Sequence, residues 1–216
     1  MAMRAIFLCL KSSIDKRNIV IYNYNIMEIV LASNNQHKTK EIKEILPDFD
    51  IISMKDAGID IEIEETGTTF EENARIKAKT ITELTGKVAL ADDSGLCVEA
   101  LNGAPGVYSA RYSGKGDDEN NKLLLRNMKG IENRKAYFQC DIVVTFPDGK
   151  EILEVGKWHG KIAHEMSGKN GFGYDVLFIP DEEPNKTSAE LEPDEKNIIS
   201  HRGIALQKIK RRLESL

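Results

Sequence analysis

The sequence has few cysteines, no excess of positive charge and no metal-binding histidine motif. Its three cysteines, Cys9, Cys97 and Cys140, are odd in number and far apart, which argues against a disulfide framework or a zinc site and favours a reducing cytoplasm. The 216 residues carry a net charge of −5, which argues against general binding to nucleic acid or acidic lipid. The four histidines are scattered and form no HExxH pattern, and the glycines of a Walker loop are missing. Any phosphate binding must therefore come from a few individually placed cations.

The first 26 residues differ from the rest of the chain. The apolar run over residues 5–10 is too short for a membrane span or a signal-peptide core, and charged residues follow it. A second methionine, Met27, directly precedes the first convincing strand. We predict that residues 1–26 are an extension outside the main fold, arising from an upstream start codon, and that residues 27–216 form one domain. The alternative is an extra edge strand over residues 18–24.

Hydrophobic periodicity predicts an α/β protein with a mixed sheet. Continuous apolar runs over 29–32 and 88–91 indicate strands buried on both faces, and alternation over 59–63 indicates a half-buried strand. A hairpin is expected around Pro147-Asp148-Gly149, between strands over 136–146 and 151–162. The remaining expectations are short strands near 51–52 and 176–178, an irregular segment over 103–116, and helices over 38–46, 70–84, 117–128, 193–200 and 203–213.

Asp92 and Asp93 are the strongest single feature of the sequence. They follow the buried run 88–91 and precede Ser94-Gly95, which predicts an acidic turn at the end of a strand. Open α/β sheets bind ligands beyond the carboxyl ends of their strands. One carboxylate can coordinate a metal ion while the other orients or deprotonates water. The alternative is an Asx turn or a helix cap.

Two lysines lie on the apolar sides of predicted helices. Lys77 falls within the stripe of Phe70, Ala74, Ile81 and Leu84, where an unpaired ammonium would be costly. It therefore faces either an internal partner or a phosphate in a cleft. Lys38 lies in the first turn of the helix that follows Ser33-Asn34-Asn35, where backbone amides attract anions. The simpler interpretation of that segment is an ordinary N-cap with surface lysines.

Glu65 stands at the end of the predicted strand over 59–63. Counting by twos from Ile59 places Glu65 on the apolar side and Glu64 on the outside. An inward carboxylate suits magnesium, which prefers hard oxygen ligands and bridges substrate phosphates. The Glu-Glu-Thr-Gly string matches a fragment of the Nudix box, but the preceding residues do not fit that motif.

Two later segments complete the candidate site. In Asn170-Gly171-Phe172-Gly173-Tyr174-Asp175 the glycines allow close approach of a ligand, and Phe172 can stack on a base or belong to the core. Asp175 is either an acceptor for a base edge or part of a turn. Ser200-His201-Arg202-Gly203 lies between two helices, with Lys196 one turn earlier. Arginine is a natural donor to a purine O6 or N7, although cations are also common at helix ends.

These strings occur together and in one order. The sequence resembles the inosine/xanthosine triphosphate pyrophosphatase family, which removes deaminated purine nucleotides. The resemblance covers residues 27–212. The matching strings are Leu31-Ala32-Ser33-Asn34-Asn35 with Lys38, Glu65-Thr66-Gly67-Thr68-Thr69-Phe70 with Glu72-Asn73-Ala74 and Lys77, Ala91-Asp92-Asp93-Ser94-Gly95-Leu96, Gly103-Ala104-Pro105-Gly106-Val107-Tyr108-Ser109-Ala110-Arg111-Tyr112, Gly171-Phe172-Gly173-Tyr174-Asp175, and Glu195-Lys196 with Ser200-His201-Arg202-Gly203.

The resemblance implies an elongated two-lobed α/β fold with a central mixed sheet flanked by helices and the active site in the cleft between the lobes. It also implies a cytoplasmic homodimer that uses Mg²⁺ to cleave dITP, ITP, XTP or dXTP into a nucleoside monophosphate and pyrophosphate. By this similarity Asp93 is the general base and a metal contact, and Glu65 is a second metal contact. Asn34 departs from the family pattern, because many members carry glycine there. The implied substrate contacts are Ser33, Asn34, Asn35, Lys38, Lys77 and Ser94 on the triphosphate, and Phe172, Gly173, Tyr174, Asp175, Lys196, His201 and Arg202 around the base.

Two other functions remain open at this point. A Maf-like nucleotide pyrophosphatase has a similar architecture and a different base preference. A non-catalytic nucleotide-binding module would keep the pocket and lose turnover, which the intact Glu65 and Asp93 argue against. An arginine donor at the C6 position favours the keto oxygen of inosine and xanthosine over the amino group of adenine. Guanine also carries O6, so its rejection needs contacts at the 2-position.

Overall fold

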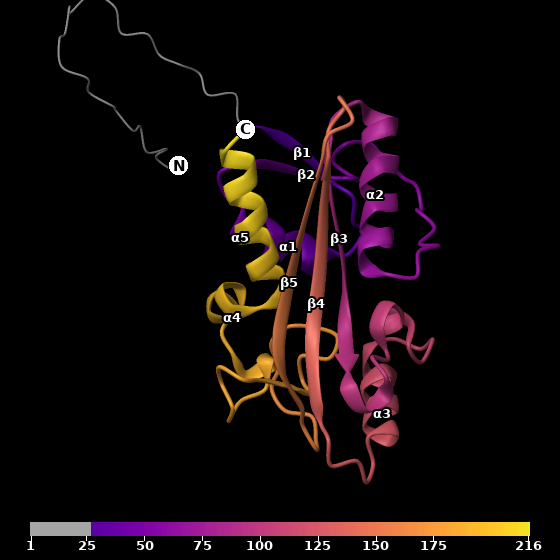
Figure 1. Cartoon of the computed structure of the whole chain (residues 1–216), viewed down its shortest axis with the longest axis vertical. Helices are drawn as coiled ribbons and strands as arrows, with labels where there is room; N and C mark the ends of the chain where they lie inside the picture. The colour runs from indigo at the N-terminus through magenta and orange to yellow at the C-terminus, as the bar shows by residue number, and fades with distance from the viewer. Residues whose placement is uncertain (1–26) are drawn as a thin grey trace, which may run out of the picture.

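The computed structural model describes residues 27–216, which form an elongated molecule (Figure 1). The predicted extension over 1–26 and the alternative strand over 18–24 lie outside the described residues. The remaining chain forms six strands and five α-helices, in an order close to the prediction. The strands are β1 (Glu28–Leu31), β2 (Asp50–Ser53), β3 (Val88–Val98), β4 (Lys135–Thr145), β5 (Glu151–Ile162) and β6 (Phe178–Pro180); the helices are α1 (Gln36–Ile45), α2 (Phe70–Thr85), α3 (Asp117–Asn127), α4 (Pro193–Ile199) and α5 (His201–Glu214).

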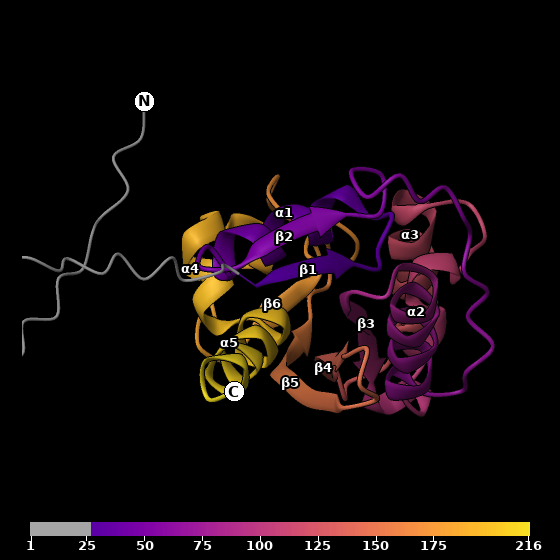
Figure 2. The ribbon, with the colours of Figure 1, turned by 90° about the horizontal axis from the view of Figure 1, so that it is seen from above.

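The six strands form one mixed sheet in the order β2-β1-β3-β4-β5-β6. β1 pairs in parallel with β2 and β3, whereas the β3–β4, β4–β5 and β5–β6 pairs are antiparallel. The predicted α/β class and mixed sheet are therefore confirmed. Viewed from above, the sheet curls, so that β1 and β2 lie across from β4 and β5 (Figure 2).

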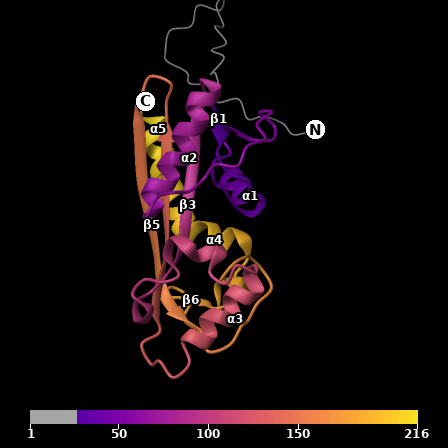
Figure 3. The ribbon, with the colours of Figure 1, turned by 90° about the vertical axis from the view of Figure 1, so that its right-hand side faces the viewer.

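Helices cover both faces of the long strands. α2 packs on one face of β3 and β4, and α5 packs on the opposite face of β4 and β5. Each face has its own apolar core, because side chains along a strand alternate in direction. A third core fills the other half of the molecule, around Leu96, Phe138, Trp158 and Phe178. The first two cores lie in one half of the molecule and the third core lies in the other. Figure 3 shows that the long strands extend from one half into the other.

β3 differs from the prediction in a way that matters for the site. The string Asp92-Asp93-Ser94-Gly95 is the middle of an 11-residue strand and forms no turn. It pairs with β4 throughout, and Asp93 lies opposite Asp141. Burial and pairing with the 11-residue strand β4 override the turn preference of these residues. Because successive side chains of a strand point to opposite faces, the two aspartates enter different environments.

Other local expectations also need correction. The segment over 59–63 is not a strand, and Ile61 is exposed. Leu84 is exposed as well, so the buried stripe of α2 ends at Ile81. The irregular segment contains a 3₁₀ helix, Gly106–Arg111, and the short strand expected over 176–178 begins at Phe178.

Candidate functional site

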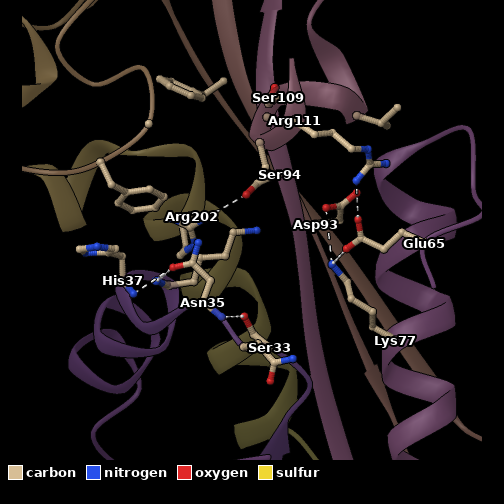
Figure 4. Close-up of a pocket in the computed structure, with 18 of the residues that line it drawn as sticks. Ser33, Asn35, His37, Glu65, Lys77, Asp93, Ser94, Ser109, Arg111 and Arg202 are labelled. Carbon is tan, nitrogen blue, oxygen red and sulfur yellow. Dashed lines mark hydrogen bonds and ion pairs between the residues drawn. The ribbon is translucent and has the colours of Figure 1, made fainter. Parts of the chain in front are cut away.

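The predicted site residues all line one cavity of about 710 Å³ between the two halves of the molecule. Figure 4 shows α2 on one side of β3, and α1 with the start of α5 on the other. Asp92 does not line the cavity: it lies beneath the wall and is fully buried. The cavity also includes residues to which the sequence analysis assigned no role, among them His37, Ser109, Arg111 and Asp117.

The α2 side of the cavity holds a cluster of two carboxylates and one lysine. Lys77 Nζ lies 2.7 Å from Glu65 Oε1 and 3.5 Å from Asp93 Oδ1. Asn73 is fully buried beside them and donates from Nδ2 to Asp93 Oδ2 at 3.1 Å. Its Oδ1 accepts from the Gly67 amide at 2.8 Å, so this one side chain positions both Asp93 and the segment that carries Glu65. The inward placement expected of Glu65 is found, although that segment is not a strand.

The two carboxylates of this cluster have different proton affinities. Burial raises the pKa of Asp93, and Lys77 and Lys38 only partly offset it. Burial acts in the same direction on Glu65, but the charge and hydrogen bond of Lys77 outweigh it and lower the pKa. Asp93 is therefore the stronger base of the pair, and Glu65 the more readily ionised carboxylate.

These residues fit a magnesium ion. Magnesium is commonly bound by one or two carboxylates together with substrate phosphates and water, and Glu65 and Asp93 supply two such carboxylates around one ammonium group. Within residues 27–216, no three or more His, Cys, Asp or Glu side chains form a group able to hold a metal ion. A bound ion would consequently depend on the substrate for further ligands.

The opposite face of β3 carries a second charge cluster centred on Asp92. Its Oδ1 pairs with Lys38, and its Oδ2 accepts from Arg202 Nε at 3.0 Å and from the thiol of Cys140 at 2.9 Å. Burial alone would raise the pKa of Asp92, but Arg202 and Lys38 hold it far below its usual range. Asp92 is thus a permanently ionised anchor that links a lysine of α1 with an arginine of α5.

Arg202 is almost completely buried and uses all three guanidinium nitrogens. Besides Asp92, it donates to Glu41 at 2.5 Å and to the Ser94 hydroxyl at 2.9 Å. Glu41 also accepts from Lys196 at 3.1 Å, and Lys196 in turn contacts Asp175 at 2.6 Å. Sequence analysis missed Glu41, which follows Lys38 by three residues and therefore lies on the same side of α1.

Phe172 lies beside these cations. Lys196 Nζ lies 5.1 Å from the ring centroid, and the His37 ring stacks on it at 5.2 Å. The loop around Phe172 is fixed by the Asp175 carboxylate, which accepts from the Phe172 amide at 2.8 Å. Asp117 and Asn121 of α3 hold the amide and the carbonyl of Gly173. An aromatic face with adjacent donors is suited to a planar heterocycle.

His201 is buried between aromatic rings. Its ring stacks on Phe138 with a centroid distance of 4.7 Å, and Nδ1 has no hydrogen-bond partner among the described residues. Burial, reinforced by Arg202 and Lys196, lowers the pKa of His201 well below its usual value. The neutral imidazole therefore lines the cavity while its Nδ1 atom is buried.

The start of α1 places a capped helix N-terminus at the cavity. Asn35 is the N-cap, and its side-chain oxygen accepts from the amides of His37 and Lys38 at 2.9 and 3.2 Å. Ser33 Oγ in turn accepts from the Asn35 amide at 3.2 Å. Ser33, Asn34 and Asn35 all line the cavity beside Lys38. Helix N-termini of this kind attract phosphate groups.

This fold and site define the chain as an α/β protein with one cavity that combines carboxylates, cations and an aromatic ring. A family model described as the Ham1 family matches residues 29–212. The chain therefore belongs to the Ham1 family, which confirms the family resemblance found in the sequence.

Known relatives are similar along nearly their whole length. A dITP/XTP pyrophosphatase of Clostridium perfringens is 51% identical over 202 residues, covering 88% of this chain and 98% of the relative. A dITP/XTP pyrophosphatase of Campylobacter jejuni is 47% identical, covering 84% and 94%. Among solved structures, a HAM1 protein from Coxiella burnetii superposes with a TM-score of 0.81 at 44% identity, covering 88% of this chain and all of that one. The Staphylococcus aureus Ham1 protein gives 0.80 at 43% identity, covering 87% and 98%.

Proposed function

We propose that this chain hydrolyses deaminated purine nucleoside triphosphates, namely dITP, ITP, XTP and dXTP, to the monophosphate and pyrophosphate. The observation that carries the proposal is the composition of one cavity. A carboxylate–lysine cluster lies on the α2 side of β3, and the α1 terminus with Lys38 lies on the other side, together with Phe172 and buried donors. About 710 Å³ falls in the usual range for small-molecule sites. The names of the relatives support the same substrate class.

The residues suit attack of water on the α-phosphorus. Asp93 accepts the proton of the attacking water as the new P–O bond forms, and its raised pKa makes it an effective base. The bond from the α-phosphorus to the oxygen bridging the α and β phosphates breaks, and pyrophosphate leaves with that oxygen. Lys77 and Lys38, with Ser33, Asn34, Asn35 and Ser94, bind the phosphates and offset their charge.

Magnesium is the proposed cofactor, held by Glu65 and Asp93. When bound, it neutralises phosphate charge and polarises the phosphoryl oxygens. Lys77 lies between the two carboxylates and keeps them from repelling one another. We therefore expect pyrophosphate release to require added MgCl₂ and to stop when EDTA is present in excess.

Base selection follows from the donors around Phe172. Hypoxanthine and xanthine carry a keto oxygen at C6, which accepts from Lys196 or Arg202. Adenine carries an amino donor there, so it would leave a buried donor pair unsatisfied, a large penalty in an enclosed site. His201 adds the polar edge of a neutral ring. We propose Phe172, Gly173, Tyr174 and Asp175 as the remaining contacts around the base, with Phe172 providing the stacking surface.

One assay tests this function. Pyrophosphate release is measured from dITP, XTP, dGTP, dATP and dTTP, each with and without MgCl₂. We expect release from dITP and XTP at least about tenfold faster than from dATP, the size of one missed buried hydrogen bond at C6, and also faster than from dGTP and dTTP. Preference for dTTP would favour a Maf-like enzyme, and nucleotide binding without release from any substrate would favour a non-catalytic module.

We further propose that the protein is a homodimer of the cytoplasm, with catalysis confined to residues 27–216. The family resemblance supports the dimer, and the low cysteine count supports a reducing compartment. None of the described helices is long and apolar enough to cross a membrane. Sedimentation velocity of the purified chain measures the oligomeric state, and a monomer at micromolar concentration would contradict the dimer.

A further inference from the structure

Arg111 is a cavity-lining cation to which the mechanism above gives no task. It ends the 3₁₀ helix Gly106–Arg111, and its side chain is about half exposed, at 47%. The backbone of this helix is fixed to the body of the protein. Ser109 Oγ accepts from the Leu96 amide of β3 at 2.9 Å, and Asn120 donates to the Ala110 carbonyl at 3.1 Å. A fixed backbone therefore presents a half-exposed side chain to the cavity.

The contacts of Arg111 are weaker than those of the other cations around the cavity. Its Nη1 lies 3.3 Å from Glu65 Oε2, whereas Lys77 approaches the other oxygen of that carboxylate to 2.7 Å. Lys196 and Arg202 each contact two buried carboxylates, and Lys38 pairs with Asp92. Arg111 is consequently the cation in this cavity that exchanges its partner most easily, because an exposed single ion pair contributes little free energy.

The guanidinium group is held in a suitable direction. It lies over the Tyr108 ring, 5.4 Å from the centroid, which restrains the stem without satisfying its N–H donors. Figure 4 shows Arg111 on the same side of β3 as Glu65, Asp93 and Lys77, with His37 and Arg202 on the other side. Since His37 stacks on Phe172, Arg111 lies at the end of the cavity away from the proposed base position.

We propose that Arg111 binds the leaving pyrophosphate, moving from Glu65 to the β and γ phosphate oxygens when a nucleotide binds. This inference rests on the proposed function. The outer phosphates lie furthest from the base, and their several negative charges compete well against one half-buried carboxylate. A guanidinium group matches two phosphate oxygens at once. It also stabilises the charge that collects on the β-phosphate as the α–β bond breaks.

The test measures binding of the two products separately, by calorimetry in buffer with MgCl₂. The variants are Arg111→Gln, Arg111→Lys and the control Lys115→Gln, which removes the same charge from an exposed position four residues away. We expect Arg111→Gln to bind inorganic pyrophosphate about tenfold more weakly, the effect of one charge-assisted hydrogen bond. Arg111→Lys should be intermediate. Binding of IMP to each variant, and both ligands with Lys115→Gln, should stay within about twofold of wild type.

Unchanged pyrophosphate affinity in Arg111→Gln would overturn the proposal. Equal weakening of IMP and pyrophosphate would also overturn it, because Arg111 would then act only by shaping the site around Glu65. These measurements need no turnover, so they separate this inference from the proposed function. Arginine-dependent pyrophosphate binding without hydrolysis of any triphosphate would refute the function alone, whereas failure of the wild-type chain to bind pyrophosphate would refute the role of Arg111.

Discussion

Asp92 and Asp93 are adjacent in β3, yet their carboxylates lie on opposite faces of the sheet. Asp92 contacts Arg202, Lys38 and the Cys140 thiol beneath the cavity wall. Asp93 contacts Asn73 and lines the cavity beside Lys77. The pKa of Asp92 is lowered and that of Asp93 is raised, although both side chains are buried. The number and proximity of the surrounding cations decide the direction of each pKa shift. They distinguish a structural carboxylate, Asp92, from Asp93, which we propose as the reactive one.

Isosteric amide variants of these two aspartates should therefore have opposite effects on stability. Asp92→Asn leaves Lys38 and Arg202 without their shared buried counter-charge and should lower the free energy of unfolding by about 3–5 kcal/mol. Asp93→Asn removes a carboxylate whose ionised form is disfavoured by burial, so its free energy of unfolding at pH 7 should equal or exceed that of wild type. Urea unfolding monitored by circular dichroism measures both values.

Turnover adds a second readout for the same pair. Asp93→Asn should lose at least about 100-fold in kcat, as expected when a general base is removed, while binding of IMP is retained. Comparable destabilisation by the two variants would contradict the division into structural and reactive carboxylates. Wild-type turnover of Asp93→Asn would remove Asp93 from the role of base.

The order of elements was predictable because periodicity is a local property. The hairpin of β4 and β5 and the helices α2 and α3 were placed to within two residues of their observed ends. The continuation of β3 through Asp92 was not predictable from neighbouring residues, which favour a turn. It depends on pairing with β4 and on Arg202, which lies 110 residues further along the chain.

The cavity residues were found where the sequence carried an unusual local signal. Lys77 stood out as a cation on an apolar helix stripe, and in the structure it lines the cavity. Glu41 gave no such signal, because a glutamate three residues after a lysine is ordinary on a helix surface. Only its buried partners Lys196 and Arg202, more than 150 residues later, distinguish it. Charge pairs between residues so far apart in the sequence can be recognised only from the three-dimensional structure.

Stability should fall in mildly acidic solution because of His201. Its folded-state pKa is lowered, so below about pH 6.5 the unfolded chain takes up a proton that the folded protein excludes. The free energy of unfolding should therefore decrease as pH falls from 6.5, with this group contributing up to about 1.4 kcal/mol per pH unit. His201→Phe keeps an aromatic ring against Phe138 and should lose that part of the slope.

The measurement is urea unfolding at pH 7.5, 6.5 and 5.5 for the wild type, His201→Phe and His159→Phe. His159 is exposed on β5 and serves as the matched control, which should keep the wild-type slope. Asp92 does not interfere in this window, because its contribution is lost only as pH falls below about 3.8. If the free energy of unfolding has the same dependence on pH in wild type and His201→Phe, the inference that His201 is neutral when buried is refuted.

The two glycines that flank Phe172 should differ in their tolerance of alanine. Both have positive φ, +76° for Gly171 and +61° for Gly173, so each substitution carries strain of about 1–2 kcal/mol. A Cβ on Gly171 would also overlap the carboxylate of Asp175, whereas one on Gly173 would meet open space. Gly171→Ala must displace the acceptor that holds Lys196 and the Phe172 amide.

Gly171→Ala should consequently raise KM for dITP by about tenfold or more, the loss of one charge-assisted contact, with Gly173→Ala within about threefold. Pyrophosphate affinity should not change in either variant, because the substitutions lie beside the proposed base position. Steady-state kinetics measure KM for dITP, and calorimetry measures the affinity for pyrophosphate. An equal rise of KM in both variants would mean that backbone strain alone matters and that the Asp175 carboxylate does not position the base.

Glu65 and its neighbour Glu64 provide a matched pair for the proposed metal site. Glu65 is half-buried against Lys77, whereas Glu64, expected on the outside, is exposed but also lines the cavity. Glu65→Gln removes one of the two proposed anionic oxygen ligands, so the Mg²⁺ concentration for half-maximal pyrophosphate release from dITP should rise by about tenfold or more. Saturating Mg²⁺ should restore much of kcat, because Asp93 remains as base and ligand. Glu64→Gln should follow the wild-type titration within about twofold. A metal titration of Glu65→Gln that coincides with wild type would exclude Glu65 as a ligand and leave it as the partner of Lys77 alone.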